Sequence, residues 1–246
     1  MPTPEESISA LQVQSEVAPE IQDDFELDVP ASELDPSDLR DRPEIQARLA
    51  KRIASTEIKL LQQPRPGKKL LVLDIDYTLF DLGSTAERPE QLARPFLHEF
   101  LAAEVKMREL GVSTHPAYKL TFMLDHMAMV TVNHAKHGVF NCKPLGFVWE
   151  KMSANYSPSN TIMMDDLRRN YVLNPQNGLV IRPFRKAHRT RDKDRELLYL
   201  KEYLLKIAPL ESLDGLDHDE WETFAAPEIA AARRALKHAR RAAEDA

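Results

Sequence analysis

The chain has 246 residues, of which 43% are hydrophobic and 29% are charged, and its formal net charge is −6 at pH 7. This length fits one domain of ordinary size with tails, or two small domains. No apolar run reaches the roughly 20 residues that a membrane-spanning helix needs, and the acidic balance argues against a general nucleic-acid binder. We therefore expect neither a membrane partner nor direct contact with nucleic acid. The single cysteine, Cys142, excludes an internal disulfide framework and fits a structural role better than that of a nucleophile.

Residues 1–44 are predicted to form a disordered acidic tail. Acids are dense there, Arg40 and Arg42 are the only bases, and Phe25 is the only aromatic residue. Such a segment buries too little apolar surface to offset the entropy lost on ordering. A solvated linker is the favoured interpretation, and an acidic docking segment is the alternative.

Residues 45–67 are predicted to be a helix and a linker. Ile45, Leu49 and Ile53 recur at helical spacing, and the pattern continues to Gln62 before the prolines that follow it.

Two apolar runs that end in acids are the sharpest signal in the chain. Residues 70–73 read Leu-Leu-Val-Leu and lead into Asp74 and Asp76, and residues 161–164 lead into Asp165 and Asp166. Short continuous apolar runs are typical of strands buried on both faces of a parallel sheet, where ligands bind at the carboxyl ends. We therefore predict an α/β fold with these acids at one edge of its sheet.

The remaining predicted elements complete this fold. In chain order they are a helix over 94–111, an antiparallel meander over 118–124, 127–133 and 138–142, a helix over 147–156, a strand over 179–181, a helix over 192–207 and an exposed Ala/Arg-rich helix over 225–246.

The acids point to phosphoryl chemistry. Asp74 and Asp76 lie two apart at a strand end, so both carboxylates are expected to converge, and Asp165 would complete a magnesium site because hard cations take oxygen ligands. A carboxylate of such a site attacks phosphorus, and a neighbouring carboxylate moves the proton. Lys143 is the candidate that balances charge on the phosphoryl oxygens. The alternative is that these acids only cap the turns that follow them.

A basic stretch surrounds His188. Arg185, Lys186, Arg189 and Arg191 lie within a few residues of it. Two interpretations stay open: a surface that holds a phosphorylated partner, or a solvated face.

Several segments together resemble one family. LLVLDIDYTLF resembles motif I of the haloacid-dehalogenase superfamily, in its FCP/SCP-like protein phosphatase branch. RPFLHEFL, KMRELGVS, YKLTFMLD, CKPLGFVW, NTIMMDD, NPQNGL and IRPFRKAH are similar to members of that branch that carry an N-terminal ubiquitin-like domain. The likeness runs from about Lys68 to Trp221, and we expect the phosphatase domain to cover residues 68–224.

The resemblance implies a role for each acid of the first motif. Asp74 would be the nucleophile and a Mg²⁺ ligand. Asp76 would be the general acid and base and would offer its backbone carbonyl to the metal. Thr78 would support the loop.

The resemblance also implies roles for later residues and a biological setting. Lys143 would neutralise the phosphoaspartate, and Asp165 would bind Mg²⁺ with Asp166 beside it. The family is nuclear and removes phosphate from phosphoserine and phosphothreonine in proteins. The implied substrates and partners are the C-terminal repeats of RNA polymerase II and subunits of the proteasome.

Two departures from the family pattern qualify these expectations. Only the acidic tail precedes the catalytic part, where the family has its ubiquitin-like domain. Residues 101–105 join two helices directly where the family has a strand ending in the phosphate-binding hydroxyl of motif II, a loss of roughly 15 to 20 residues. The sequence therefore predicts a haloacid-dehalogenase-like sheet with one core strand missing and weakened or absent turnover.

Three functional interpretations remain open. An active protein phosphatase is favoured by the intact acids and lysine. A catalytically impaired phosphopeptide-binding module, or a truncated splice form, is favoured by the absent motif II. A small-molecule phosphatase is less favoured, because a short meander in place of a large cap leaves a cleft open enough for a peptide.

Overall fold

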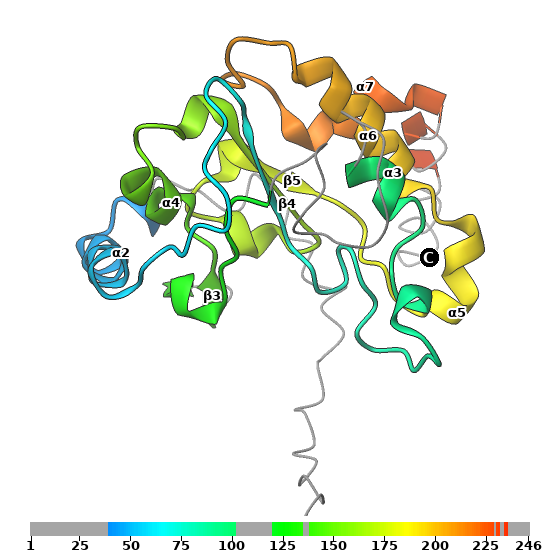
Figure 1. Cartoon of the computed structure of the whole chain (residues 1–246), viewed down its shortest axis with the longest axis horizontal. Helices are drawn as coiled ribbons and strands as arrows, with labels where there is room; N and C mark the ends of the chain where they lie inside the picture. The colour runs from blue at the N-terminus through cyan, green and yellow to red at the C-terminus, as the bar shows by residue number, and fades with distance from the viewer. Residues whose placement is uncertain (1–38, 102–119, 135–137, 229, 232–233, 236–246) are drawn as a thin grey trace, which may run out of the picture. The chain divides into compact units, whose positions relative to one another are not determined.

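A computed structural model describes residues 39–101, 120–134, 138–228, 230–231 and 234–235 (Figure 1). The helices are α2 (Pro43–Ser55), α3 (Leu97–Leu101), α4 (Leu145–Lys151), α5 (Ala187–Thr190), α6 (Glu196–Ile207) and α7 (Trp221–Ala225). The strands are β1 (Leu70–Leu73), β2 (Val130–His134), β3 (Gly138–Cys142), β4 (Thr161–Asp165) and β5 (Gly178–Val180). Short 3-10 turns join several of them, among them η7 (Arg168–Tyr171), η9 (Arg191–Lys193) and η10 (His218–Glu220).

The central sheet is parallel, with the strand order β1-β4-β5. Leu73 of β1 lies opposite Met164 of β4, and Met163 of β4 lies opposite Gly178 of β5. All five residues of β4 are buried, as the continuous apolar run predicts for a middle strand covered on both faces. The predicted α/β class with a parallel sheet and flanking helices is confirmed.

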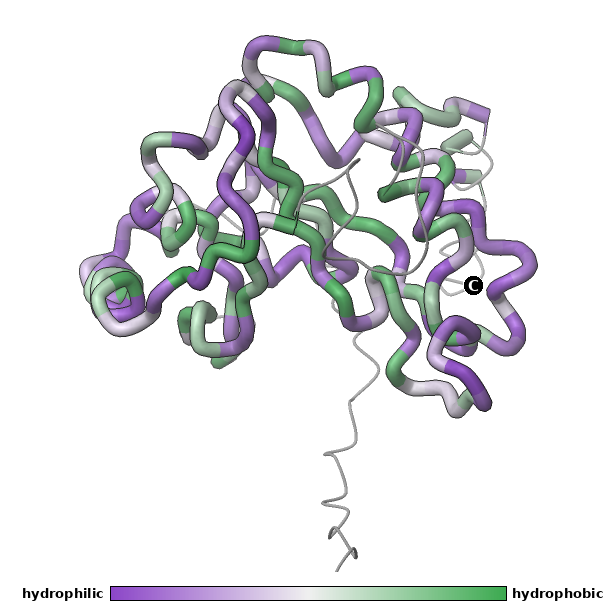
Figure 2. The backbone as a smooth tube through the Cα atoms, viewed as in Figure 1, coloured by the Kyte–Doolittle hydropathy of each residue, from purple (hydrophilic) through white to green (hydrophobic). Residues whose placement is uncertain are grey.

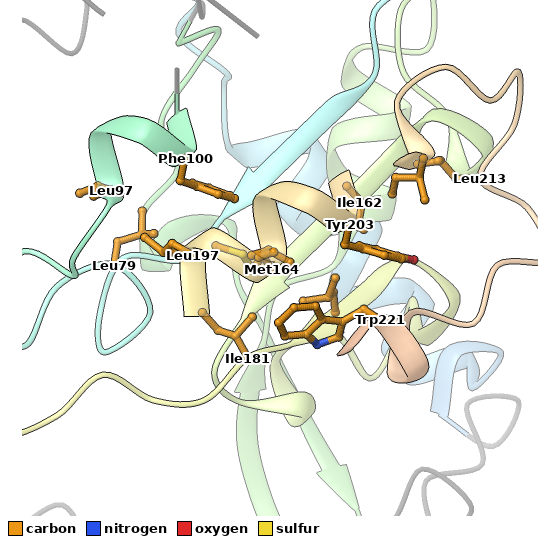
Figure 3. Close-up of a cluster of buried hydrophobic side chains, with 13 residues drawn as sticks. Leu79, Leu97, Phe100, Ile162, Met164, Ile181, Leu197, Tyr203, Leu213 and Trp221 are labelled. Atoms are coloured by element: carbon orange, nitrogen blue, oxygen red, sulfur yellow. The ribbon is translucent and has the colours of Figure 1, made fainter. Parts of the chain in front are cut away.

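Helices cover the two faces of this sheet, and β4 alternates between them. Ile162 and Met164 belong to a large apolar core with residues of α3, α6 and α7, which Figure 3 shows from the helix side. Met163 points the other way and packs with Leu145 of α4. Along the trace in Figure 2, hydrophobic residues are concentrated on the central strands.

The small antiparallel element is a two-stranded hairpin of β2 and β3, in which Val130 lies opposite Cys142. The third strand predicted over 118–124 is wrong for its described part, residues 120–124. Phe122 there makes only an isolated bridge with Leu60, and Leu61 donates its backbone N–H to the Thr121 carbonyl at 2.8 Å.

The same contact explains why the first helix is shorter than predicted. The helix expected to reach Gln62 ends at Ser55, because Thr56 takes an extended conformation (φ −117°, ψ 130°). Residues 60–61 then run beside residues 121–122. Apolar spacing alone does not distinguish this extended stretch from another helical turn.

Other boundaries also shift. The helix predicted from Arg94 begins only at Leu97, because Phe96 has a positive φ of 62°. Its predicted continuation over 102–111 lies outside the described residues. The helices predicted over 147–156 and 192–207 are observed as α4 (Leu145–Lys151) and α6 (Glu196–Ile207).

The ends of the chain are only partly described. Residues 1–38 of the predicted acidic tail lie outside the described residues, whereas Leu39 is fully buried and α2 begins at Pro43. The Ala/Arg-rich segment over 225–246 also lies largely outside them. Among the described helices, none has both the length and the apolar character needed to cross a membrane.

In the described part of the chain, β1 pairs with β4 alone and forms an edge of the sheet. The prediction that a core strand is missing after α3 falls on the segment that includes residues 102–119, which lie outside the described residues.

Candidate active site

The parallel sheet brings the acids of two separate motifs together. Asp74 extends the pairing of β1, because its backbone N–H donates to the Met164 carbonyl at 3.0 Å. Asp165 is the last residue of β4. One carboxylate oxygen from each of Asp74, Asp165 and Asp166 lies within 4.8 Å of the other two. The carboxyl edge of the sheet therefore carries three converging carboxylates.

Lys143 lies between two of these carboxylates. Its Nζ donates to Asp74 Oδ1 at 2.5 Å and to Asp165 Oδ2 at 2.7 Å. The lysine follows β3 directly, and its backbone N–H donates to the Asn170 carbonyl at 2.5 Å. Burial favours a lower pKa for Lys143, but the charges of Asp165 and Asp74 outweigh it and the pKa is raised. The lysine is therefore held as a cation.

Asp165 is fully buried, and both of its carboxylate oxygens accept hydrogen bonds. Its Oδ1 accepts from Asn170 Nδ2 at 2.8 Å and from the Leu167 backbone N–H at 2.9 Å. Burial, together with the Asp74 charge and against the pull of Lys143, raises the pKa of Asp165 to about 6.

With Asp166, the cluster has three carboxylates against the single ammonium group of Lys143, so its charge is negative when all three are ionised. Burial, and then the charges of Asp165 and Asp74, raise the pKa of Asp166 to about 7, although Arg185 opposes the shift. Its buried Oδ2 atom has no hydrogen-bond partner within the described residues. Three carboxylates, one lysine and an unpartnered buried oxygen suit a divalent cation with oxygen ligands. The chemistry of these donors therefore fits a metal site.

Thr78 joins the two strand ends. It is fully buried, and its Oγ1 accepts the Asp166 backbone N–H at 3.1 Å, while its carbonyl accepts from Arg94 Nη1 at 3.0 Å. The neighbouring Tyr77 has a positive φ of 59°. This side chain therefore holds the loop after β1 against the loop after β4.

Asp76 is placed differently from the other acids. Its side chain is exposed and does not belong to the three-carboxylate cluster. The chain turns directly after Asp76, where Tyr77 takes its left-handed conformation and donates its N–H to the Phe80 carbonyl. The expected convergence of the Asp74 and Asp76 carboxylates stays a prediction. A metal contact through the Asp76 backbone carbonyl stays a prediction.

Comparison with known proteins decides the family. The sequence model of the NLI interacting factor-like phosphatases matches residues 69–214. The chain belongs to this family. That match lies within the phosphatase domain predicted over residues 68–224.

Relatives within the family carry a common name. The chain is 52% identical over 225 residues to the ubiquitin-like domain-containing CTD phosphatase of Arabidopsis thaliana, covering 84% of this chain and 65% of that protein. It is 45% identical over 242 residues to ubiquitin-like domain-containing CTD phosphatase 1 of Xenopus tropicalis, covering 91% and 74%. The corresponding human protein is 48% identical over 205 residues, covering 76% of this chain and 64% of that protein. The chain thus spans about two thirds to three quarters of the length of these relatives.

Two features of this phosphatase site were not predicted from the sequence. Asn170 fixes both Asp165 and the backbone of Lys143, but it lies in a short turn with no periodic pattern. Arg94 has a side chain that is 1% exposed and forms an ion pair with Asp194 at 2.9 Å, across 100 positions of sequence. No local signal marks either contact.

Cys142 is not part of the phosphatase chemistry. It is fully buried, its Sγ donates to the Val130 carbonyl at 3.3 Å, and burial raises the pKa of its thiol to about 12. A neutral buried thiol is a poor nucleophile. Its role is therefore structural, as the sequence indicates.

Proposed function

We propose that the chain is a Mg²⁺-dependent protein serine/threonine phosphatase that acts through an aspartyl-phosphate on Asp74. The observation that carries the proposal is the position of Lys143 between Asp74 and Asp165, within a cluster of three carboxylates at the carboxyl edge of the sheet. Membership of a phosphatase family supports it.

Asp74, Asp165 and Asp166 are the residues that would hold Mg²⁺. When bound, the ion supplies positive charge for the equatorial oxygens of the transferred phosphoryl group and keeps the carboxylates ionised. The raised pKa values of Asp165 and Asp166 indicate how costly these charges are without a cation.

The protein's own groups divide the reaction into two displacements. A carboxylate oxygen of Asp74 attacks phosphorus, the bond from phosphorus to the seryl or threonyl oxygen breaks, and Asp76 donates its proton to that leaving oxygen. Asp76 then takes a proton from a water molecule, which attacks the phosphoaspartate and releases inorganic phosphate and free Asp74. The exposure of Asp76 suits this task, because the leaving group and the water both come from the open side.

Lys143 acts on charge and position in this scheme. Its ammonium group lies 2.5 Å from Asp74 Oδ1, so it lies beside the carboxylate that receives the phosphoryl group. A fixed cation there stabilises negative charge that develops on the phosphoryl oxygens. Thr78 keeps the loop in register through its contact with the Asp166 backbone.

The proposed substrates are phosphoserine and phosphothreonine proteins of the nucleus. The relatives are named CTD phosphatases, which supports the C-terminal repeats of RNA polymerase II as a substrate. Proteasome subunits are proposed as further substrates on the family resemblance of the sequence. The proposed localisation is the nucleus, and the proposed partners include RNA polymerase II and the proteasome.

Hydrolysis of a phosphoserine peptide by the purified chain tests this function. We expect phosphate release with Mg²⁺ and none with a chelator, and restoration when Mg²⁺ is added back. A folded protein that binds the peptide without releasing phosphate would contradict the proposal and identify a phosphopeptide-binding module. That second function is favoured by the absence of a sequence match to motif II.

A further inference from the structure

A strongly basic pocket lies beside the active-site loop. Its volume is about 580 Å³, and it is formed by residues 182–199 together with Arg94. Six cations line it, against the two acids Asp194 and Glu196. The basic stretch that the sequence shows around His188 contributes Arg185 and Arg189 to this pocket.

Both acids of the pocket already accept hydrogen bonds from the protein. We call the ion pair of Arg94 and Asp194 the floor of the pocket. Asp194 accepts from Nε and Nη2 of the buried Arg94, with contacts of 2.9 to 3.2 Å. Buried Glu196 accepts the backbone N–H of Arg182 at 3.2 Å. One acid is thus neutralised by an arginine that is itself buried, and the other acid is buried.

Two exposed cations, Arg189 and Lys193, form what we call the rim of the pocket, and neither has an acidic partner among the described residues. Arg189 of α5 and Lys193 of η9 are both exposed, and the described residues provide no hydrogen bond or ion pair to either side chain. Both side chains line the same pocket. Guanidinium and ammonium groups in this arrangement suit a phosphate group.

Residues that line the pocket contact the loop that follows Asp74. The Phe184 backbone N–H donates to the Tyr77 carbonyl at 2.5 Å. Arg185 lies over the Tyr77 ring at 4.3 Å from its centroid, and its charge also acts on Asp166. The backbone N–H of Ala187 donates to Asp81 Oδ2 at 2.7 Å, which fixes α5 to the same loop.

We propose that this pocket is a second phosphate subsite. It binds a second phosphate group of a multiply phosphorylated protein substrate while the first is presented to Asp74. Arg189 and Lys193 hold the second phosphate, and the pair Arg94 and Asp194 forms the rigid floor. This inference rests on the proposed function, and it predicts that the enzyme prefers neighbouring phosphorylated residues over isolated ones.

A binding experiment with the full chain carrying Asp74→Asn tests the subsite without requiring turnover. Fluorescence anisotropy would compare a singly phosphorylated peptide with doubly phosphorylated peptides in which the second phosphoserine is moved stepwise along either side. We expect at least one spacing to bind about tenfold more tightly, as charge-assisted contacts allow, and the gain to decrease with salt.

Paired variants identify the groups responsible. Arg189→Gln with Lys193→Gln should abolish the gain from the second phosphate. Lys51→Gln with Lys59→Gln removes two other exposed cations, one in α2 and one after it, and should preserve the gain. Thermal unfolding of each variant would verify that the fold is retained.

Three results would overturn the subsite: no spacing that binds more tightly, a gain that survives the Arg189 and Lys193 changes, or an equal gain when glutamate replaces the second phosphoserine. Failure of the proposed function would appear separately, as a wild-type chain that binds these peptides without hydrolysing them.

Discussion

The active site and the basic pocket use charge in opposite ways. In the active site, Lys143 is held within 2.7 Å of both Asp74 and Asp165, and the surplus charge is negative. In the pocket, the acids accept hydrogen bonds from the protein and the rim cations Arg189 and Lys193 face solvent. Buried, paired charges carry strong and salt-resistant interactions, whereas exposed ones are screened. This difference supports the proposal that the first region carries out phosphoryl transfer and the second selects the substrate.

The largest expected effect follows from removing the nucleophile. Asp74→Asn keeps the size of the side chain but removes the attacking carboxylate, so phosphate release from a phosphoserine peptide should fall at least about 10³-fold. Asp214→Asn, an exposed change elsewhere on the chain, is the matched control and should be neutral. Comparable rates for the two variants would remove Asp74 from its proposed role.

The next largest effect is expected on the free energy of unfolding, when the ion pair of Arg94 and Asp194 in the pocket floor is broken. Arg94→Met leaves Asp194 partly buried without its partner and removes the contact to the Thr78 carbonyl. Breaking such a pair costs about 3–5 kcal/mol in unfolding free energy, measured by urea denaturation. A loss below about 1 kcal/mol would show that the floor is not a fixed element. Adding Asp194→Asn to Arg94→Met should recover part of the loss.

Lys143 is expected to matter for rate more than for binding. Lys143→Met should lower kcat about 10²- to 10³-fold, because it removes a fixed cation beside the receiving carboxylate. Lys143→Arg keeps the charge and should retain more activity. Steady-state kinetics with a phosphoserine peptide would separate kcat from KM, and a change confined to KM would contradict the assigned position.

A smaller effect is expected on the pH dependence of the stability of the metal-free protein. The folded-state pKa values of Asp165 (about 6) and Asp166 (about 7) exceed their usual value of 3.8, so the folded state holds more protons than the unfolded state within that interval. These two groups therefore remove stability as pH rises from about 4 to about 7. In thermal melts with a chelator, Asp166→Asn should reduce the loss of stability between about pH 4 and about pH 7. Mg²⁺ should stabilise the wild type more at pH 7 than at pH 5. Identical curves for wild type and variant would contradict the assigned charge balance.

The sheet and its acids were predictable because the signal is local. The apolar runs before Asp74 and Asp165 correspond to β1 and β4, and parallel pairing alone brings their acids to one edge. The position of Lys143 was proposed with support from the family resemblance. Its ion pairs to both acids, one of them across 69 residues of sequence, follow from the fold.

The missed features depend on contacts between distant segments. Arg94 was predicted to begin a helix over 94–111, whereas its side chain forms a buried ion pair with Asp194, far along the chain. The early end of α2 depends on the chain near Thr121. Asn170, in a turn that shows no periodic pattern, contacts both Asp165 and the backbone of Lys143. Local periodicity contains no information about such partners.

Chemical trapping of the intermediate tests the central claim most directly. The wild-type chain, mixed with phosphoserine peptide and Mg²⁺, would be quenched during turnover with borohydride, which reduces an acyl-phosphate to an alcohol. Peptide mass spectrometry should then find the side chain at position 74 reduced, and only in samples that received phosphopeptide. Reduction at another carboxylate, or phosphate release by the wild-type chain with an unmodified Asp74 in every trapped sample, would contradict an aspartyl-phosphate at this residue.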